Sequence, residues 1–289
     1  MIICIVGPTG VGKTKMSVAL AKKYNAIIIN CDATQVYKEL DIGSAKATKE
    51  EQDNIPHYLL DFKNINEEYT VYDYQIDARK IIEDNKDKNI IFVGGTGLYL
   101  KAALYDYRFT KEDKHDNYDN LTNEELYELC KKKNPNLTIH LNNRQRLIRY
   151  LNKEDIQLVE PKPLYKHLII GLTTSRDNLY KIINDRVDKM INDGLLEEVN
   201  NFYNKGINTK PLLNAIGYKE LYQYFRKEIS LEEAIDLIKK NSRHYAKRQY
   251  TFFNNQLDVN WFNVNYESFD LTIDEVEKFI KENYDDKSK

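Results

Sequence analysis

Cysteine is scarce in this sequence, and long hydrophobic runs are lacking. Only three cysteines occur in 289 residues, and Cys4, Cys31 and Cys130 lie far apart with no Cys-x-x-Cys pair. This usage argues against a zinc site and against a disulfide framework, so we expect three reduced thiols. No stretch approaches the roughly 20 apolar residues that cross a bilayer, and the first residues show neither a cationic region nor a signal-peptide cleavage site. The sequence therefore predicts a cytoplasmic protein with no membrane partner.

A large excess of one charge is also lacking, because the formal net charge is only -2. Two segments are nevertheless basic: residues 140–149 hold three arginines and residues 239–248 hold five lysines or arginines, with no acidic residue in either. A polyanion would have to be attracted by these local patches and not by the charge of the whole chain. The alternative for each patch is an ordinary solvated helix face.

Short β-branched runs alternate with helical periodicity through the first third of the chain. The runs IICIV, AIIIN and NIIFVGG are separated by KMSVALAKKY and VYDYQIDARKIIEDNK, which predicts a parallel sheet with crossover helices. The run HLIIGLTT at 167–174 is expected to rejoin the sheet, whereas the preceding segments TNEELYELCKKKN and NRQRLIRYLNKEDI are charged and helical. We therefore predict an α/β fold: a P-loop NTPase-like core with a mostly parallel sheet flanked by helices, formed by residues 1–109 and 167–289, plus a helical insertion domain at 110–166.

The segment GPTGVGKT matches the phosphate-binding pattern G-x-x-x-x-G-K-[ST]. It follows the strand-like run Ile2–Val6 and opens an amphipathic helix, which is the context that this loop requires. Backbone N–H groups and the helix N-terminus would face the anion, with a positive charge from Lys13 and a hydroxyl suited to Mg²⁺ from Thr14. The loop comprises Gly7, Pro8, Thr9, Gly10, Val11, Gly12, Lys13 and Thr14. The alternative is a glycine-rich turn that binds nothing.

The acid that a nucleotide-hydrolysing P-loop protein carries at the end of a late buried strand is missing, because NIIFVGG continues into GGTGLY. An acid follows the second strand instead, as Asp32 in AIIINCDATQVY. This places Asp32 at the carboxyl edge of the sheet, where ligands of open α/β sheets bind. Its position is equally compatible with a Mg²⁺ ligand, a turn-forming residue and a general base.

Several separated segments together resemble the tRNA dimethylallyltransferases, also called tRNA isopentenyltransferases. In order they are GPTGVGKT, DATQVYKELDIGSAK, PHYLLD, VGGTGLYLKA, RQRLIR, RVDKMINDGLLEEV, AIGYKEL and AKRQYTFF, and they cover nearly the whole chain. The bacterial type is the closer resemblance, because no C-terminal Cys/His zinc-finger pattern occurs. Two positions depart from the usual family pattern: Ala33 stands in place of serine and Phe252 in place of tryptophan.

The resemblance implies an activity and roles for particular residues. A dimethylallyl group would pass from dimethylallyl diphosphate to the N6 amine of adenosine 37, next to the anticodon of tRNAs that read codons beginning with U, with release of pyrophosphate. The loop would hold the diphosphate, with Mg²⁺ on Thr14 and added contacts from Thr9 and Arg186; the alternative for Arg186 is a solvated helix charge. Asp32 would be the general base, and Lys13 and Thr14 the other catalytic residues.

The resemblance also implies where tRNA binds. Asp32, Ala33, Thr34, Gln35 and Thr96 would line the nucleoside end of a channel, although Gln35 could be a surface residue and Thr96 a helix N-cap. Arg146 and Arg149 share one helix face, and basic residues beside aromatic ones suit phosphate contact and base stacking. The remaining expected tRNA-binding residues are Gln145, Leu147, Ile148, Lys247 and Arg248. We expect a monomer that binds the anticodon stem-loop.

Three other functions remain open from the sequence. A nucleotide-dependent small-molecule kinase would explain the loop but leave both basic segments without a role. A prenyltransferase acting on a free adenine nucleotide would use Asp32 in the same way but need no extended basic surface. A non-catalytic RNA-binding module would use the loop as a switch.

Overall fold

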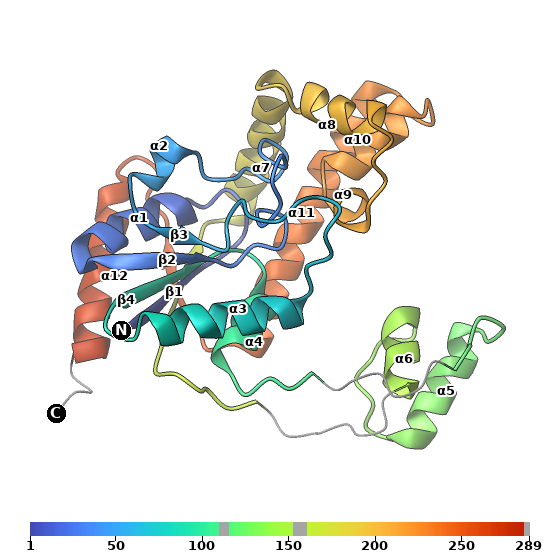
Figure 1. Cartoon of the computed structure of the whole chain (residues 1–289), viewed down its shortest axis with the longest axis horizontal. Coiled ribbons are helices and arrows are strands. Elements are labelled where there is room, and N and C mark those ends of the chain that lie inside the picture. The colour runs from blue at the N-terminus through green and yellow to red at the C-terminus, as the bar shows by residue number, and fades with distance from the viewer. Residues whose placement is uncertain (110–115, 153–160, 286–289) are drawn as a thin grey trace. The chain divides into compact units, whose positions relative to one another are not determined.

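The computed structural model describes residues 1–109, 116–152 and 161–285. It divides into two compact units, residues 1–105 with 163–289 and residues 106–162. The first unit contains a six-stranded, wholly parallel sheet in the order β3-β2-β4-β1-β5-β6. Strands β1 to β4 are labelled in Figure 1. The strands are β1 (Ile2–Val6), β2 (Ala26–Asn30), β3 (His57–Tyr58), β4 (Asn89–Val93), β5 (Leu168–Thr173) and β6 (Asn260–Asn263). The predicted α/β fold with a parallel sheet is confirmed, and the edge strands β3 and β6 are additions to it.

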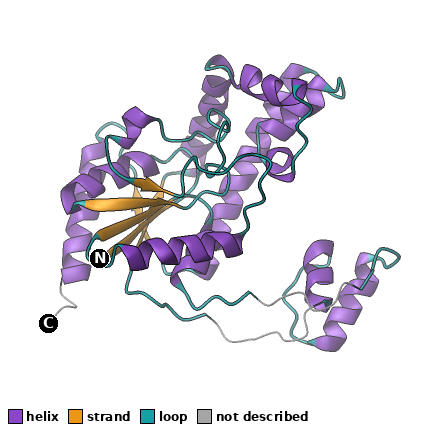
Figure 2. Cartoon of the chain, in the orientation of Figure 1, coloured by secondary structure: helices purple, strands orange, loops and turns teal. Residues whose placement is uncertain are grey.

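The centre of the sheet is buried on both faces, as its continuous apolar runs require. On one face, Ile3 and Ile5 belong to a core formed with α1 (Lys13–Tyr24) and α12 (Phe269–Ile280). On the other face, Cys4 and Val6 belong to a core formed with α3 (Val71–Asp84) and α4 (Gly97–Leu104). Successive strand residues thus pack against opposite helix layers, and helices flank the sheet in Figure 2.

The rest of the first unit is helical. The long helices α7 (Arg176–Asn192) and α11 (Leu231–Gln256) pack against each other (Figure 1). A capping box fixes the start of α11: Ser230 Oγ accepts from Glu233 N over 3.2 Å, and Glu233 Oε2 accepts from Ser230 N over 2.7 Å. The shorter elements are α2 (Lys49–Gln52), α8 (Leu195–Asn204), α9 (Lys210–Asn214), α10 (Tyr218–Phe225) and a π-helical turn at Lys281–Asp285.

The second unit is a small helical body of its own. Its helices α5 (Asn123–Lys133) and α6 (Arg144–Leu151) enclose Leu126, Cys130 and Leu147. Tyr105 and Pro163 form an antiparallel bridge within the first unit, so the chain leaves and re-enters that unit at paired positions. Residues 153–156 of the expected helix NRQRLIRYLNKEDI lie outside the described residues. Within the described ranges, no helix has the length and apolarity needed to span a membrane.

Candidate active site

Loops that follow β1, β2 and β4 meet at the carboxyl edge of the sheet. The Cys31 amide donates to Val93 O over 2.7 Å, and the Thr96 amide donates to Cys31 O over 3.0 Å. The Gly94 amide donates to Ile5 O over 3.2 Å. These bonds join the loop after β4 to its two neighbours, so segments more than sixty residues apart in sequence form one edge.

The glycine-rich loop has the backbone of a phosphate-binding loop. Gly7, Gly10 and Gly12 have φ angles of +139°, +90° and +86°, a region that side chains other than glycine rarely adopt. A β-carbon on Gly7 would lie only 2.5 Å from Leu172 O. Gly12 caps α1 without a side-chain hydrogen bond, so the amides of the first helical turn remain directed at the loop as they would be for an anion.

Lys13 is held inside this loop. Its Nζ donates to Pro8 O over 2.7 Å. Burial and the neighbouring Arg186 guanidinium, against the opposing charge of Asp32, together lower the pKa of the Lys13 amine to about 8. Burial likewise lowers the pKa of Arg186, against the carboxylates of Asp32 and Glu51. The structure therefore brings Arg186, from α7, into the same electrostatic cluster as Lys13 and Asp32.

Asp32 uses one carboxylate oxygen to build a turn. Its Oδ1 accepts from Thr34 N over 2.9 Å and from Gln35 N over 3.4 Å. Its Oδ2 lies on the side of Gly95, where a β-carbon would stand 3.8 Å from it. A turn-forming role for Oδ1 is therefore compatible with a proton-accepting role for Oδ2.

Thr96 and Gln35 make hydrogen bonds that were not predicted from the sequence. Thr96 occupies the N-cap position of α4 but its side chain makes no cap bond there; its Oγ1 instead accepts from Ala33 N over 3.1 Å. The partly buried Gln35 donates from Nε2 to both Ser44 O and Ala45 O over 3.1 Å. Thr96 thus ties the loop after β2 to the loop after β4, and the amide nitrogen of Gln35 is engaged by a neighbouring loop.

Two residues of α11 join the site without having been singled out from the sequence. Gln249 is 4% exposed and donates from Nε2 to Gly95 O over 3.1 Å, while its Oε1 is buried with no partner among the described residues. Burial, followed by the Asp32 charge, raises the pKa of the Tyr245 hydroxyl, against the opposing effect of the neighbouring Thr96 and Gln249 side chains. Their i, i+4 spacing, which places both on one face of α11, was the available sequence signal. The Arg248 guanidinium lies over the Tyr245 ring, 5.6 Å from its centroid.

The second unit carries the other basic segment. Gln145, Arg146 and Arg149 are exposed on α6, and Ile148 is partly buried. Leu147 is fully buried against Leu126 and Cys130, so its side chain packs the core of this unit and is not presented on its surface.

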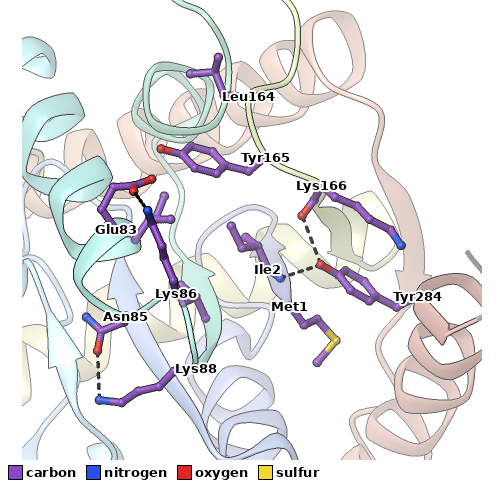
Figure 3. Close-up of a pocket in the computed structure, with 12 residues that line it drawn as sticks. Met1, Ile2, Glu83, Asn85, Lys86, Lys88, Leu164, Tyr165, Lys166 and Tyr284 are labelled. Atoms are coloured by element: carbon purple, nitrogen blue, oxygen red, sulfur yellow. Dashed lines mark hydrogen bonds and ion pairs between the residues drawn. The ribbon is translucent and has the colours of Figure 1, made fainter. Parts of the chain in front are cut away.

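A cavity of about 390 Å³ lies at the opposite edge of the sheet, where β1 and β4 begin. Its lining includes Met1, Ile2, Lys88 and Tyr284, and the Tyr284 hydroxyl accepts from Ile2 N and donates to Lys166 O (Figure 3). None of the predicted site residues lines this cavity. The candidate chemistry therefore belongs to the carboxyl edge and not to this hollow.

Comparison with known proteins identifies the family to which the chain belongs. The family model described as IPP transferase matches residues 35–256. The chain belongs to the IPP transferase family. The resemblance drawn from the sequence is thereby confirmed, and the matched region contains Gln35, Thr96, Arg186 and both basic segments.

Individual members of the IPP transferase family match over almost all of the chain. A tRNA dimethylallyltransferase of Anoxybacillus flavithermus is 43% identical, covering 97% of this chain and 96% of the relative. One of Bacillus cereus is 45% identical, covering 90% and 89%. The structure of a full-length tRNA isopentenylpyrophosphate transferase from Bacillus halodurans superposes with a TM-score of 0.79 at 39% identity, covering 99% and 97%. A eukaryotic dimethylallyltransferase acting on tRNA gives a TM-score of 0.82 at 25% identity, covering 99% of this chain and 79% of that one.

Proposed function

We propose that this chain transfers a dimethylallyl group from dimethylallyl diphosphate to the N6 amine of adenosine 37, beside the anticodon of tRNAs that read codons beginning with U, and releases pyrophosphate. The observation that carries the proposal is the electrostatic cluster of Lys13, Arg186 and Asp32 at the mouth of a phosphate-binding loop, in a chain of the IPP transferase family. Two cations beside one carboxylate suit an anionic leaving group next to a proton acceptor.

The loop would act on the donor. When the C–O bond of dimethylallyl diphosphate ionises, negative charge builds up on the departing pyrophosphate, and donors already directed at it lower the barrier. The backbone N–H groups of the loop, which Pro8 lacks, would be such donors together with Lys13 and Arg186, and the Thr9 hydroxyl would add a contact. The partly buried positions of Lys13 and Arg186 strengthen their effect, since charges act more strongly away from bulk water.

Asp32 would act on the acceptor. The N6 lone pair of adenine is delocalised into the ring, so the amine becomes a useful nucleophile only as a base removes its proton. A positioned carboxylate supplies this, typically for a gain of about 10²–10⁴ in rate. Thr34 and Gln35 donate to Asp32, and the adjacent Ala33 donates to Thr96. These residues would enclose an adenosine flipped from its stack.

Mg²⁺ suits this site by the chemistry of its donors. Magnesium commonly keeps several waters and takes only one or two protein oxygens together with the phosphates of the substrate. The hydroxyl of Thr14 in the first turn of α1 is such an oxygen, whereas no cluster of three or more His, Cys, Asp or Glu side chains occurs within the described ranges. When bound, Mg²⁺ would neutralise charge on the diphosphate.

The tRNA would be bound by both basic segments. We propose that the second unit, through Gln145, Arg146, Ile148 and Arg149, contacts the anticodon stem-loop, together with Lys247 and Arg248 on α11. Exposed arginines and lysines of this kind supply phosphate contacts. We further propose that the protein works in the cytoplasm as a monomer.

A product assay tests the proposal directly. The protein is incubated with Mg²⁺, dimethylallyl diphosphate and unmodified tRNA, and the digested tRNA is examined by mass spectrometry for the added prenyl mass; free AMP is the parallel acceptor. We expect prenylated tRNA and pyrophosphate without ATP, and no product when EDTA removes the metal. Unmodified tRNA with consumption of ATP would support a kinase instead, and preferential prenylation of AMP would support a nucleotide prenyltransferase.

A further inference from the structure

We infer that Glu198, in the first turn of α8, is a positioning residue for Gln35 at the nucleoside end of the site; this inference rests on the proposed function. The Glu198 carboxylate accepts hydrogen bonds from the backbone of the loop at residues 41–43. Its Oε2 accepts from Asp41 N over 3.1 Å and from Ile42 N over 2.8 Å, and its Oε1 accepts from Gly43 N over 3.1 Å. The Tyr218 hydroxyl also donates to Oε1. Four donors converge on one carboxylate, and hydrogen bonds to an ionised acceptor are the stronger kind.

The shape of the loop depends on these hydrogen bonds to Glu198. A β-carbon on Gly43 would lie 2.5 Å from Cε2 of Tyr218, so the loop backbone presses directly against the ring that Glu198 holds. Beyond Gly43 the chain turns back through Ala45, whose φ of +48° is left-handed and whose amide donates to Ile42 O over 2.9 Å. Residues 44 and 45 thus follow directly on the segment that Glu198 holds.

Those two carbonyls hold Gln35. Ser44 O and Ala45 O both accept from Gln35 Nε2 over 3.1 Å. The backbone N–H of Gln35 in turn donates to Asp32 Oδ1 over 3.4 Å. A continuous series of contacts therefore runs from Glu198 through the loop to Gln35 and to the proposed base, although Glu198 follows Asp32 by more than 160 residues.

A second anchor holds the other side of the same loop. Lys46, with a side chain 6% exposed, donates from Nζ to Tyr37 O over 2.8 Å and pairs with Asp41 at 2.6 Å and Asp61 at 2.7 Å. The Lys46 amide donates to Asp41 O over 3.0 Å. Because none of these bonds involves the Glu198 side chain, loss of the Glu198 carboxylate should loosen the loop without unfolding the protein.

The chain offers a matched control in the same helical turn. Glu197 and Glu198 both lie in the first turn of α8, so replacing either by glutamine removes one charge with the same effect on the helix dipole. Glu197 is exposed and Glu198 partly buried. We therefore compare Glu198→Gln and Glu198→Ala with Glu197→Gln, and measure amide hydrogen exchange together with steady-state kinetics.

In the exchange experiment, the amides of residues 41–43 should exchange at least about 10-fold faster in Glu198→Ala than in the wild type or in Glu197→Gln. In the kinetic experiment, both Glu198 variants should lower kcat with tRNA about 10-fold while KM for dimethylallyl diphosphate stays unchanged. Gln35→Ala should produce a similar loss, and the double variant Glu198→Gln with Gln35→Ala should be no worse than Gln35→Ala alone, because both changes break one series of contacts.

Three outcomes would overturn the inference: unchanged exchange in Glu198→Ala, transfer by Glu198→Gln equal to that by Glu197→Gln, or additive losses in the double variant. Failure of the proposed function looks different, since the wild type itself would then leave tRNA unmodified. Exchange of the 41–43 amides would still report in that case whether Glu198 holds the loop.

Discussion

The ammonium group of Lys13 donates a hydrogen bond of 2.7 Å to the carbonyl oxygen of Pro8, five residues earlier in the same loop. The loop therefore binds its own lysine, and it does so beside Arg186, a second cation whose pKa is also lowered by burial. A partly buried cation next to another cation is an unfavourable arrangement that an incoming diphosphate would relieve. This relationship gives the first prediction.

Lys13→Met should raise Tm at pH 7 and abolish prenyl transfer. In the folded protein the Lys13 pKa is about 8, below its ordinary 10.5. The unfolded chain therefore binds this proton more tightly, and below pH 8 the positive charge of Lys13 lowers the free energy of unfolding. Stability of the wild type should rise between pH 8 and 10.5, and the advantage of Lys13→Met should shrink over that interval. The upper limit is about 3 kcal/mol, because one pKa unit is about 1.4 kcal/mol.

Calorimetry at pH 7 and pH 10 checks this, with the exposed Lys15→Met as the control. Pyrophosphate should stabilise the wild type more than Lys13→Met, and tRNA affinity should be nearly the same in both proteins. A lower Tm for Lys13→Met at pH 7, or a comparable loss of tRNA affinity, would contradict the division of roles.

Asp32→Asn tests the role of Asp32 as a base apart from its role in the turn. Asparagine keeps an acceptor for Thr34 N, so the turn should persist, but it is no base. We expect single-turnover transfer at least ~10²-fold slower with both substrates still bound. Asp32→Ala should be slower as well and should also lose the turn. Wild-type rates in Asp32→Asn would remove Asp32 from the chemistry.

Gly95→Ala should damage the site through Gln249. The new β-carbon would lie 2.1 Å from Gln249 Nε2, forcing the amide off Gly95 O at a cost of about 1–3 kcal/mol. We expect a lower kcat with tRNA. In a Gln249→Ala background the same glycine change should have little further effect, since the clashing atom is gone. An equal loss in both backgrounds would show that Gln249 is not the cause.

Arg146→Ala should affect tRNA binding, whereas Arg144→Ala should affect the stability of the second unit. The guanidinium of Arg144 donates to Leu121 O over 2.6 Å and to Tyr118 O over 2.7 Å, so its loss should destabilise the second unit. Arg146 is exposed, and its loss should weaken tRNA binding and lower the log–log salt slope by about 1. Filter binding at several salt concentrations measures the slope. A slope unchanged in Arg146→Ala would make this arginine a solvated helix charge.

The local sequence pattern was sufficient to predict the central strands and the phosphate-binding loop. β1, β2, β4 and β5 are runs of buried β-branched residues, and GPTGVGKT carries its own geometry in its glycines, so both could be predicted from neighbouring residues. The edge strands β3 and β6 could not, because His57–Tyr58 and Asn260–Asn263 are short and mixed in polarity and become strands only by pairing with β2 and β5.

The sequence by itself determined that a phosphate-binding loop precedes a helix, that Asp32 follows a strand, and that two basic segments exist, because each depends on residues close in the chain. Only the tertiary structure decided that Thr96 bonds to Ala33 and not to its own helix, that Gln249 donates to Gly95, and that Glu198 accepts from the loop at 41–43. Those pairs are separated by 63, 154 and 155 to 157 residues. Such contacts arise when parallel strands bring their carboxyl ends to one edge, and no local periodicity records them.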